Sequence, residues 1–336
     1  MSATSSVALF KSGSRYGAGA HFIDTLALAF KNLGVPATLL DPLADDFADQ
    51  IAHLLRHPPD ACLALNANSL EFRVEGRPLH ELIGAPLIGL YIDDPLTLTD
   101  RLSHPQLATF PCPRLAAWAR ERFGIPTACL YHGATPGEGS SERPIDLLLA
   151  ATYEPPQVAL PEEWITDNSP LSGHWLLDEA HRPRTDLALR AYRRERLLQK
   201  VAEAGYTVTL VGEGWEQCPA AAAHHNLGPL PFGQTLERIA QSKVVLHVQP
   251  PFCEGSHERP LNALLRGCAV LSDSTPFLSQ QKGLLTYSWN NLEVLPYALK
   301  NWETLGKEGR QGVEYAHLWE HRATELLEMI REGRHL

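Results

Sequence analysis

The sequence predicts an α/β protein made of two doubly wound, Rossmann-like domains facing a cleft. Short apolar runs alternate with helix-length segments in both halves of the chain, which is the rhythm of parallel sheets with crossover helices. A segment rich in turn-forming residues, from His132 to Ser141, separates the two halves. The 336 residues also exceed what one ordinary core holds, so two domains are expected.

The N-terminal domain is expected over residues 1–135. It begins with the apolar run Val7–Phe10, a Gly-rich loop and a helix over about residues 20–32, in which apolar residues recur at helical spacing. Gly34 fits the end of that helix. Further strands are predicted at Ala37–Leu40, Ala61–Leu65, Leu87–Ile92, Leu107–Phe110 and Thr127–Tyr131.

The C-terminal domain is expected over residues 136–312 and begins with a strand at Ile145–Leu149. Residues 153–186 are rich in Pro and Trp and predict a long loop or lid. An arginine-rich helix over Leu187–Ala204 follows, and we interpret its charges as a solvated face; its arginines include Arg190, Arg193, Arg194 and Arg196. The later elements predicted are strands at Tyr206–Val211, Val244–Val248 and Ala269–Leu271 and a helix at Thr235–Gln241.

The last segment, residues 313–336, is expected to form a helix from about Val313 to Glu332 that packs back toward the N-terminal domain. Its apolar residues Leu318, Leu326 and Ile330 fall on one helical face.

Composition narrows the possible partners and the compartment. With 29 basic and 39 acidic residues the net charge is −10, which disfavours nucleic acid and anionic membrane surfaces as partners. Six scattered cysteines without a C-x-x-C pattern suit buried, reduced thiols. No run has the roughly 18 apolar residues of a membrane span. We therefore expect a cytoplasmic protein without an integral membrane segment.

The stretch Pro250–Asp273 is the most informative part of the chain. An apolar strand leads into Glu254 and Gly255, an amphipathic helix follows, and Gly267 precedes a second apolar strand. The backbone N–H groups at a helix start are unpaired and carry the positive end of the helix dipole, so they suit a diphosphate. The order of elements therefore predicts a site for a nucleotide-linked ligand.

The residues of this stretch resemble those of the GT-B glycosyltransferases, in particular the group 1 enzymes related to the bacterial spore-coat protein CgeB. Glu254 matches the first Glu of the motif in which two Glu residues are separated by seven others, and Gly267 falls at the family's Gly position. Arg259 matches an Arg of the CgeB-like group, whereas Asn262 stands at the second Glu position. The turn Leu210–Trp215 is similar to the family's turn beside the nucleotide.

The resemblance implies GT-B architecture and transfer of a sugar from a nucleotide diphosphate donor to an acceptor hydroxyl, without a metal or cofactor other than the nucleotide-sugar itself as co-substrate. It places the donor in the C-terminal domain and the acceptor in the N-terminal domain. Glu254 is expected to hold sugar hydroxyls as a catalytic residue; the alternative is an acid favoured by the helix dipole. The donor-binding residues expected are Gly212, Glu213, Gly214, Gly255, Ser256, His257, Arg259 and Asn262.

Asn262 leaves two points open. By resemblance, a Glu at its position grips the ribose, and Asn keeps hydrogen-bonding capacity but has no charge. The nucleotide and the stereochemical course, retaining or inverting, are therefore not predicted.

The N-terminal domain supplies the candidates for a catalytic base. Asp94 ends an apolar strand and His21 follows the Gly-rich loop, and either would take a proton from an acceptor hydroxyl if the enzyme inverts. Acceptor-side contacts are expected from Gly17, Asp93 and His132. The alternatives are a turn-forming role for Asp94 before Pro95, a solvated His21 and a hinge-packing role for His132.

Two other functions fit the same pattern. A nucleotide-sugar epimerase would isomerise the donor without an acceptor, and a non-catalytic nucleotide- or sugar-binding protein would bind without transfer. An oxidoreductase is disfavoured because the loop before His21 lacks the third glycine of the dinucleotide fingerprint. The sugar, the nucleobase, the acceptor (a glycan, a protein or a small molecule) and the oligomeric state stay open.

Overall fold

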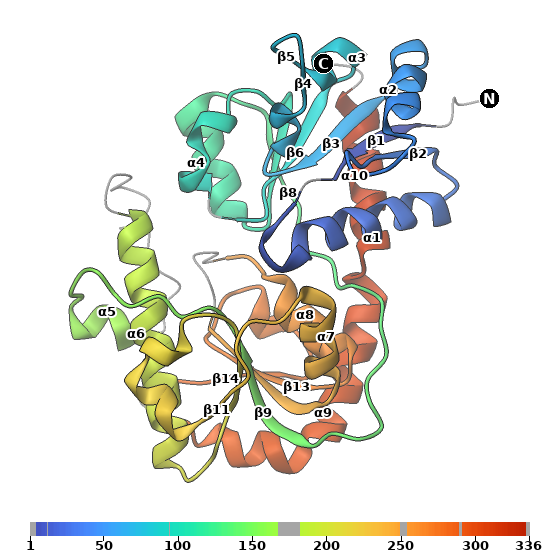
Figure 1. Cartoon of the computed structure of the whole chain (residues 1–336). Helices are drawn as coiled ribbons and strands as arrows, with labels where there is room; N and C mark the ends of the chain where they lie inside the picture. The colour runs from blue at the N-terminus through green and yellow to red at the C-terminus, as the bar shows by residue number, and fades with distance from the viewer. Residues whose placement is uncertain are drawn as a thin grey trace. The chain divides into compact units, whose positions relative to one another are not determined.

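The computed structural model describes residues 5–11, 13–93, 95–166, 182–248, 254–288 and 291–333. The chain forms two compact units (Figure 1). We call Met1–Thr135 with Leu318–Leu336 the N-terminal unit and Pro136–His317 the C-terminal unit. Each unit is built on its own sheet of six parallel strands, which confirms the prediction of two doubly wound α/β domains.

The strand order of the N-terminal sheet is β2-β1-β3-β6-β7-β8. The four central strands are almost entirely buried apolar runs, as expected for parallel strands covered on both faces, whereas the edge strands β2 and β8 are mostly half-buried. The order reverses direction between β1 and β3, so the switch point lies at their carboxyl ends. The strands are β1 (Val7–Phe10), β2 (Ala37–Leu40), β3 (Ala61–Leu65), β6 (Leu87–Leu90), β7 (Leu107–Phe110) and β8 (Thr127–Cys129). A small antiparallel hairpin, β4 (Arg73–Val74) with β5 (Arg77–Pro78), is inserted after β3.

The helices of the N-terminal unit are α1 (Ala18–Asn32), α2 (Phe47–Arg56), α3 (Leu79–Ile83), α4 (Pro113–Phe123) and α10 (Trp319–Gly333). Helix α10 packs against α1, and the rings of Phe22 and Trp319 lie 5.6 Å apart. Gly133 lies against Trp319 so closely that a Cβ on it would come within 2.7 Å of the indole.

The prediction that the last helix begins near Val313 is wrong. Residues up to Ala316 belong to the preceding helix, which ends where His317 leaves helical geometry. Leu318 then makes a parallel bridge with Ala134, and the new helix begins at Trp319. The helical periodicity continues through this break, so the sequence pattern does not reveal it.

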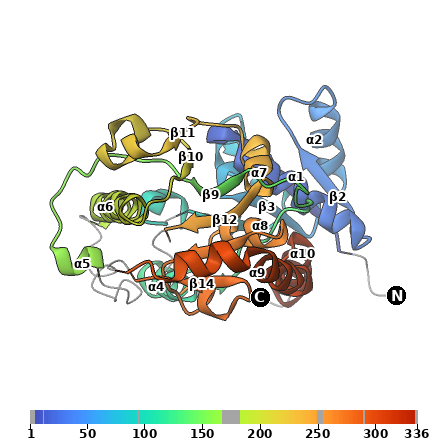
Figure 2. The same cartoon turned by 90° about the horizontal axis from the view of Figure 1, so that it is seen from below.

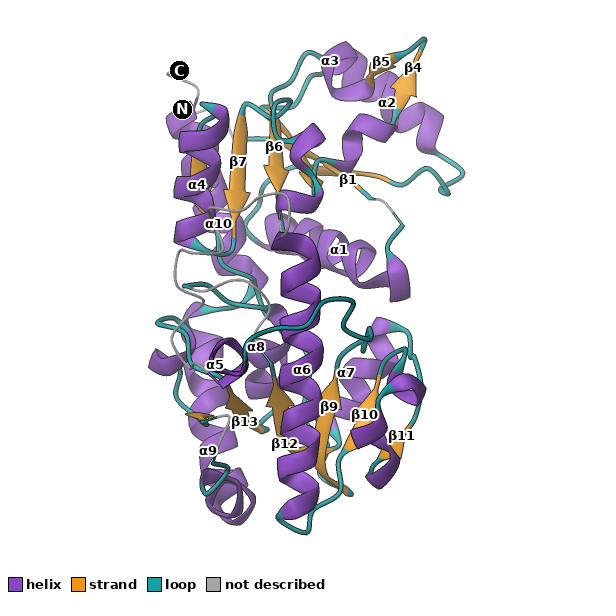
Figure 3. Ribbon diagram, turned by 90° about the vertical axis from the view of Figure 1, so that its left-hand side faces the viewer, coloured by secondary structure: helices purple, strands orange, loops and turns teal. Residues whose placement is uncertain are grey.

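The C-terminal sheet has the strand order β11-β10-β9-β12-β13-β14, with its switch point between β9 and β12. Figure 3 shows the arrowheads of neighbouring strands pointing the same way. The strands are β9 (Ile145–Ala150), β10 (Thr209–Val211), β11 (His225–Asn226), β12 (Ser242–His247), β13 (Ala269–Ser272) and β14 (Leu284–Thr286).

Helices cover both faces of this sheet. Side chains from α6 and α9 share one core with alternate strand residues such as Leu147 and Leu246. Helix α7 contacts β9 and β12, and α8 contacts β12 and β13; Figure 2 shows α6 almost end-on beside the sheet. The helices are α5 (Glu162–Thr166), α6 (Arg182–Glu203), α7 (Phe232–Ala240), α8 (Glu258–Leu265) and α9 (Val294–Ala316).

The expected long loop at 153–186 is correct only in part, because it contains α5 and the first turns of α6, while residues 167–181 lie outside the described residues. Strand β14 and helix α9 were not predicted. Within the described ranges, no helix has both the length and the apolar character needed to cross a bilayer.

Candidate functional site

The candidate site of the C-terminal unit lies at the carboxyl edge of its sheet, beside the switch point between β9 and β12. Open α/β sheets bind ligands outside the carboxyl ends of their strands at such a point. The start of α8 and the first half of α6 meet there. The guanidinium of Arg194 donates to the carbonyl of Thr152 after β9, and the Tyr287 hydroxyl donates to the carbonyl of His247 on β12 at 3.0 Å.

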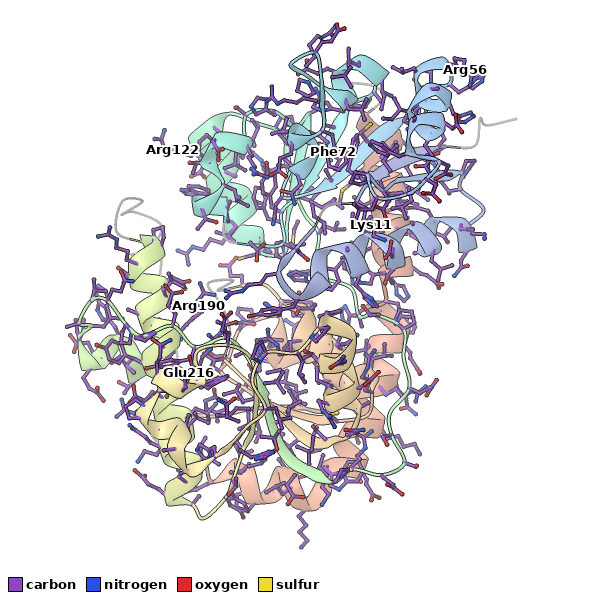
Figure 4. The ribbon with its side chains drawn as sticks, viewed as in Figure 1. Lys11, Arg56, Phe72, Arg122, Arg190 and Glu216 are labelled. Carbon is purple, nitrogen blue, oxygen red and sulfur yellow. The ribbon has the colours of Figure 1, made fainter. Side chains whose placement is uncertain are left out.

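Four arginines gather at this edge: Arg190, Arg193 and Arg194 of α6 and Arg259 of α8, which we call the arginine cluster. The three on α6 are spaced so that they share one face of the helix. The interpretation of the α6 arginines as a solvated face is therefore wrong for Arg193, which is only 5% exposed, while Arg190 and Arg194 are half-buried with buried Nε atoms. Figure 4 labels Arg190. The sequence pattern missed this because Asp273, the carboxylate that meets Arg193, comes from a distant part of the chain.

The four arginines differ in their partners. Arg190 pairs with Asp186, and Arg193 pairs with Asp273 at 3.5 Å. Arg194 donates to a neutral carbonyl, and the described residues provide no ion pair for the Arg259 guanidinium. Burial lowers the pKa of Arg194 and of Arg259. The charge of Arg190 also lowers both, whereas nearby carboxylates act in the opposite direction: Glu258 on Arg259, and Asp186 and Asp273 on Arg194. The cluster thus holds two cations without a paired carboxylate, in an environment that penalises their charge.

The start of α8 differs from the expected row of open N–H groups. Pro260, in the first turn, has no N–H, and the N–H of Arg259 donates to Nδ1 of His257, the N-cap residue, at 3.3 Å. Glu258, with its carboxylate beside the His257 ring, adds negative charge at the same place. The prediction that the helix start itself supplies the diphosphate donors is therefore wrong at two of its first three positions, and the arginine cluster is the stronger anion site.

The other predicted donor residues around α8 lie close together in the chain but in different environments. Glu254 is partly exposed in the turn before the helix, and Ser256 is fully buried. The carbonyl of Gly255 accepts from Thr275 Oγ1 at 3.2 Å. Asn262 is also fully buried and accepts from Arg266 through its side chain at 3.4 Å, so it lies in the packing of α8. Contact of these residues with a nucleotide stays a prediction.

The Gly212–Gly214 turn follows β10, which lies on the opposite side of β9 from β12. Gly212 has φ 137°, and a Cβ there would clash with the carbonyl of Ala151. Gly214 is similarly close to the carbonyl of Tyr153, whose N–H donates to the carbonyl of Glu213 at 2.8 Å. Close packing of two backbone segments therefore accounts for both glycines without a ligand.

The N-terminal unit carries a polar network where β3 and β6 end. Nδ2 of Asn66 donates to the exposed carboxylate of Asp93 at 2.8 Å, and Oδ1 of Asn66 accepts from the Ile92 N–H at 3.1 Å. Asn66 and Ala67 are both left-handed, with φ 50° and 51°. Sequence reasoning identified Asp93 but missed Asn66, whose signal is only its place after a predicted strand. Asp94 lies outside the described residues.

The remaining acceptor-side predictions occupy two other places in this unit. Gly17, with φ 80°, precedes α1, and His21 lies in its first turn, half-buried. His132 is 3% exposed, after β8. Lys11, at the end of β1, pairs with Asp24 at 3.0 Å and Asp41 at 3.2 Å.

No site for a metal ion emerges from the part of the chain that is described: it contains no group of three or more His, Cys, Asp or Glu side chains placed to bind one. The described cysteines are free thiols. Cys253 lies outside the described residues.

Comparison with known proteins is consistent with this architecture. Residues 190–328 match the family model described as glycosyl transferase-like. No protein with a curated description shows significant sequence similarity to the chain. The CgeB-like subgroup stays a prediction.

Solved structures resemble the whole chain. An α-glucosyltransferase in complex with UDP-glucose and DNA containing an abasic site matches with a TM-score of 0.61 and 10% identity, over 98% of this chain and 100% of that one. A second α-glucosyltransferase complex, with UDP and DNA containing a HMU base, has a TM-score of 0.60 at 12% identity, with the same coverage of 98% and 100%. A T4 phage β-glucosyltransferase has a TM-score of 0.52 at 10% identity, covering 97% and 96%. At these identities the likeness establishes the fold. The chain therefore has the GT-B fold of these glucosyltransferases, and its residues 190–328 resemble the glycosyl transferase-like family.

Proposed function

We propose that the protein transfers a glycosyl group from a nucleoside diphosphate sugar to an acceptor hydroxyl, with its C-terminal unit binding the donor. The arginine cluster is the observation that carries this. A nucleoside diphosphate sugar bears two negative charges on its diphosphate, and the cluster holds two guanidinium groups, those of Arg194 and Arg259, without a carboxylate partner among the described residues. Arginine forks suit phosphate oxygens.

The same cations suit the chemistry of the leaving group. When the bond from the anomeric carbon to the diphosphate breaks, negative charge grows on the phosphate oxygen. Fixed cations in a poorly solvated site stabilise that charge without reorganising. We propose that Arg194 and Arg259 supply this stabilisation independently of a metal, and that Glu254 holds sugar hydroxyls. The nucleotide-sugar is the co-substrate, and no further cofactor enters the proposal.

UDP-sugars are the first donors to test, because the similar glucosyltransferases were solved with UDP or UDP-glucose. Two of these structures also contain DNA. For this chain we propose a different acceptor, a glycan, protein or small molecule, because its net charge of −10 disfavours a polyanion. We propose the cytoplasm as the compartment, since the free cysteines suit a reducing environment.

The test is nucleotide release from UDP-, GDP-, ADP-, CDP- and dTDP-sugars, with magnesium, with manganese and with EDTA, and with methyl glycosides, peptides or duplex DNA as acceptors. The proposal predicts release from one donor class, unchanged by EDTA and not stimulated by DNA. Isomerisation of the donor without an acceptor would indicate an epimerase instead. Nucleotide binding without turnover on any acceptor would indicate a binding protein.

A further inference from the structure

The polar network of the N-terminal unit joins the ends of two strands through one side chain. The main-chain N–H of Asn66, just after β3, donates to the carbonyl of Leu90 at the end of β6 at 2.8 Å. Its side chain then holds the next segment through the Ile92 N–H and the Asp93 carboxylate. Asn66 thus uses both ends of its amide to fix where Asp93 lies.

The backbone at Asn66 is held in a costly conformation. Asn66 and Ala67 are consecutive non-glycine residues in the left-handed region, with φ 50° and 51°. Strain of this kind persists where surrounding contacts over-determine it, often at functional sites. Here the contacts come from Arg101, which donates to the Asn66 carbonyl at 3.5 Å and to Asn68, and pairs with Glu71 at 2.8 Å.

The place of this network is where a doubly wound sheet binds its ligand. The switch point of the N-terminal sheet lies between β1 and β3, and Asn66 is the first residue after β3. Asp93 is exposed there, and Asn66 Nδ2 bonds only its Oδ2 atom. A carboxylate fixed at one oxygen presents the other in a defined direction, which suits a hydroxyl donor.

We infer that Asn66 is a positioning residue for the acceptor, which aligns the Asp93 carboxylate to accept a hydrogen bond from the acceptor hydroxyl. This rests on the proposed glycosyl transfer and adds the residue that sets the acceptor geometry.

The test is Asn66→Asp, which is isosteric and tolerates left-handed φ. It replaces the amide donor by a second carboxylate, so two like charges face each other where a hydrogen bond held Asp93. Nucleotide release, with water or methyl glycosides as acceptor, is measured against pH. We expect the acidic limb of the profile to move to higher pH by about one unit, with activity recovered above it.

The matched control is Asn68→Asp, which makes the same change of charge two residues further along, beside Arg101 instead of Asp93. We expect this variant to leave the acidic limb of the pH profile at its wild-type position. Asn66→Gly keeps the backbone conformation but loses the amide, and it lowers turnover about tenfold. In an Asp93→Asn background, Asn66→Asp no longer moves the limb.

The inference is overturned if the acidic limb does not move in Asn66→Asp, or if it moves equally in Asn68→Asp. Either result leaves the proposed glycosyl transfer intact. Failure of the wild-type protein to bind or turn over any nucleotide-sugar would instead contradict the proposed function. UDP binding, measured by calorimetry, separates these cases because the expected donor residues lie in the other unit.

Discussion

The two units use the same sheet architecture but opposite chemistry at their carboxyl edges. In the C-terminal unit, the four residues of the arginine cluster outnumber the two carboxylates that pair with them, Asp186 and Asp273. In the N-terminal unit, Lys11 lies between Asp24 and Asp41, and Asp93 is held by a neutral amide. A doubly wound sheet provides the location of a site, and the side chains at its strand ends decide the ligand. The cationic edge suits a diphosphate, and the carboxylate edge suits a hydroxylated acceptor.

The largest expected effect concerns the buried ion pair behind the cationic edge. Asp273→Asn leaves the buried Arg193 without its counter-charge, and breaking such a pair typically costs about 3–5 kcal/mol. Urea unfolding followed by tryptophan fluorescence measures the loss. Asp146→Asn is the control, because its pair with Lys243 at 2.6 Å is exposed and worth about 0–1 kcal/mol. Equal losses of unfolding free energy in both variants would show that the Arg193–Asp273 pair stabilises the fold no more than an exposed pair does.

Next is the function of the cationic edge. Replacing Arg194 and Arg259 together by Met should lower nucleotide release about 10²–10³-fold, as expected for removing charge stabilisation of a transition state. The melting temperature without ligand should not fall, because two cations lacking carboxylate partners are removed from a penalising site. Arg196→Met, on the same helix but paired with the exposed Glu162, should keep full turnover. A similar loss of turnover in the Arg196 variant would argue against a specific anion site.

A smaller effect distinguishes packing from ligand binding at the end of β10. Gly212→Ala places a methyl group against the Ala151 carbonyl and should lower the free energy of unfolding by about 1–3 kcal/mol. Gly233→Ala meets no atom within 4 Å, lies in α7, and should raise it by up to about 1 kcal/mol. If Gly212→Ala abolished nucleotide binding without loss of stability, the turn would contact the ligand after all.

The smallest expected effect concerns the charge of Asp41 at the carboxyl edge of the N-terminal sheet. The Leu43 N–H and then Lys11 hold the pKa of Asp41 below its ordinary value of 3.8. A lowered pKa stabilises the fold above pH 3.8, and that contribution is lost as the pH falls through the lowered pKa. Asp41→Asn should therefore cost about 0.2–1 kcal/mol at pH 7, with the difference from wild type closing in acid. Asp45→Asn, which replaces an exposed acid in the same loop, is the matched control and should leave the free energy of unfolding at pH 7 unchanged.

Local sequence was enough for much of the fold. β1, β2, β3 and β7 begin and end as predicted. For β1, β3 and β7 the reason is that a parallel strand buried on both faces is a run of apolar residues. The break between α9 and α10 was missed because it depends on the pairing of Leu318 with Ala134, which no local pattern encodes.

The candidate site was harder to predict for the same reason. Glu254 and Arg259 stand in a recognisable motif, but the partners of the α6 arginines come from several separate elements. The helix therefore appeared solvated although Arg193 on it is buried. The role proposed for Asn66 depends on a left-handed backbone and on the neighbouring strand of the sheet. Neither can be recognised from the presence of a single Asn in the sequence.

The most direct test of the diphosphate site is calorimetric titration of UDP into three proteins: wild type, the Arg194→Met/Arg259→Met double variant and Asn66→Asp. We expect binding to the wild type, retained affinity in Asn66→Asp and loss of binding in the double arginine variant. Equal affinity of the wild type and the double arginine variant for UDP would contradict the assignment of the arginine cluster as the donor site.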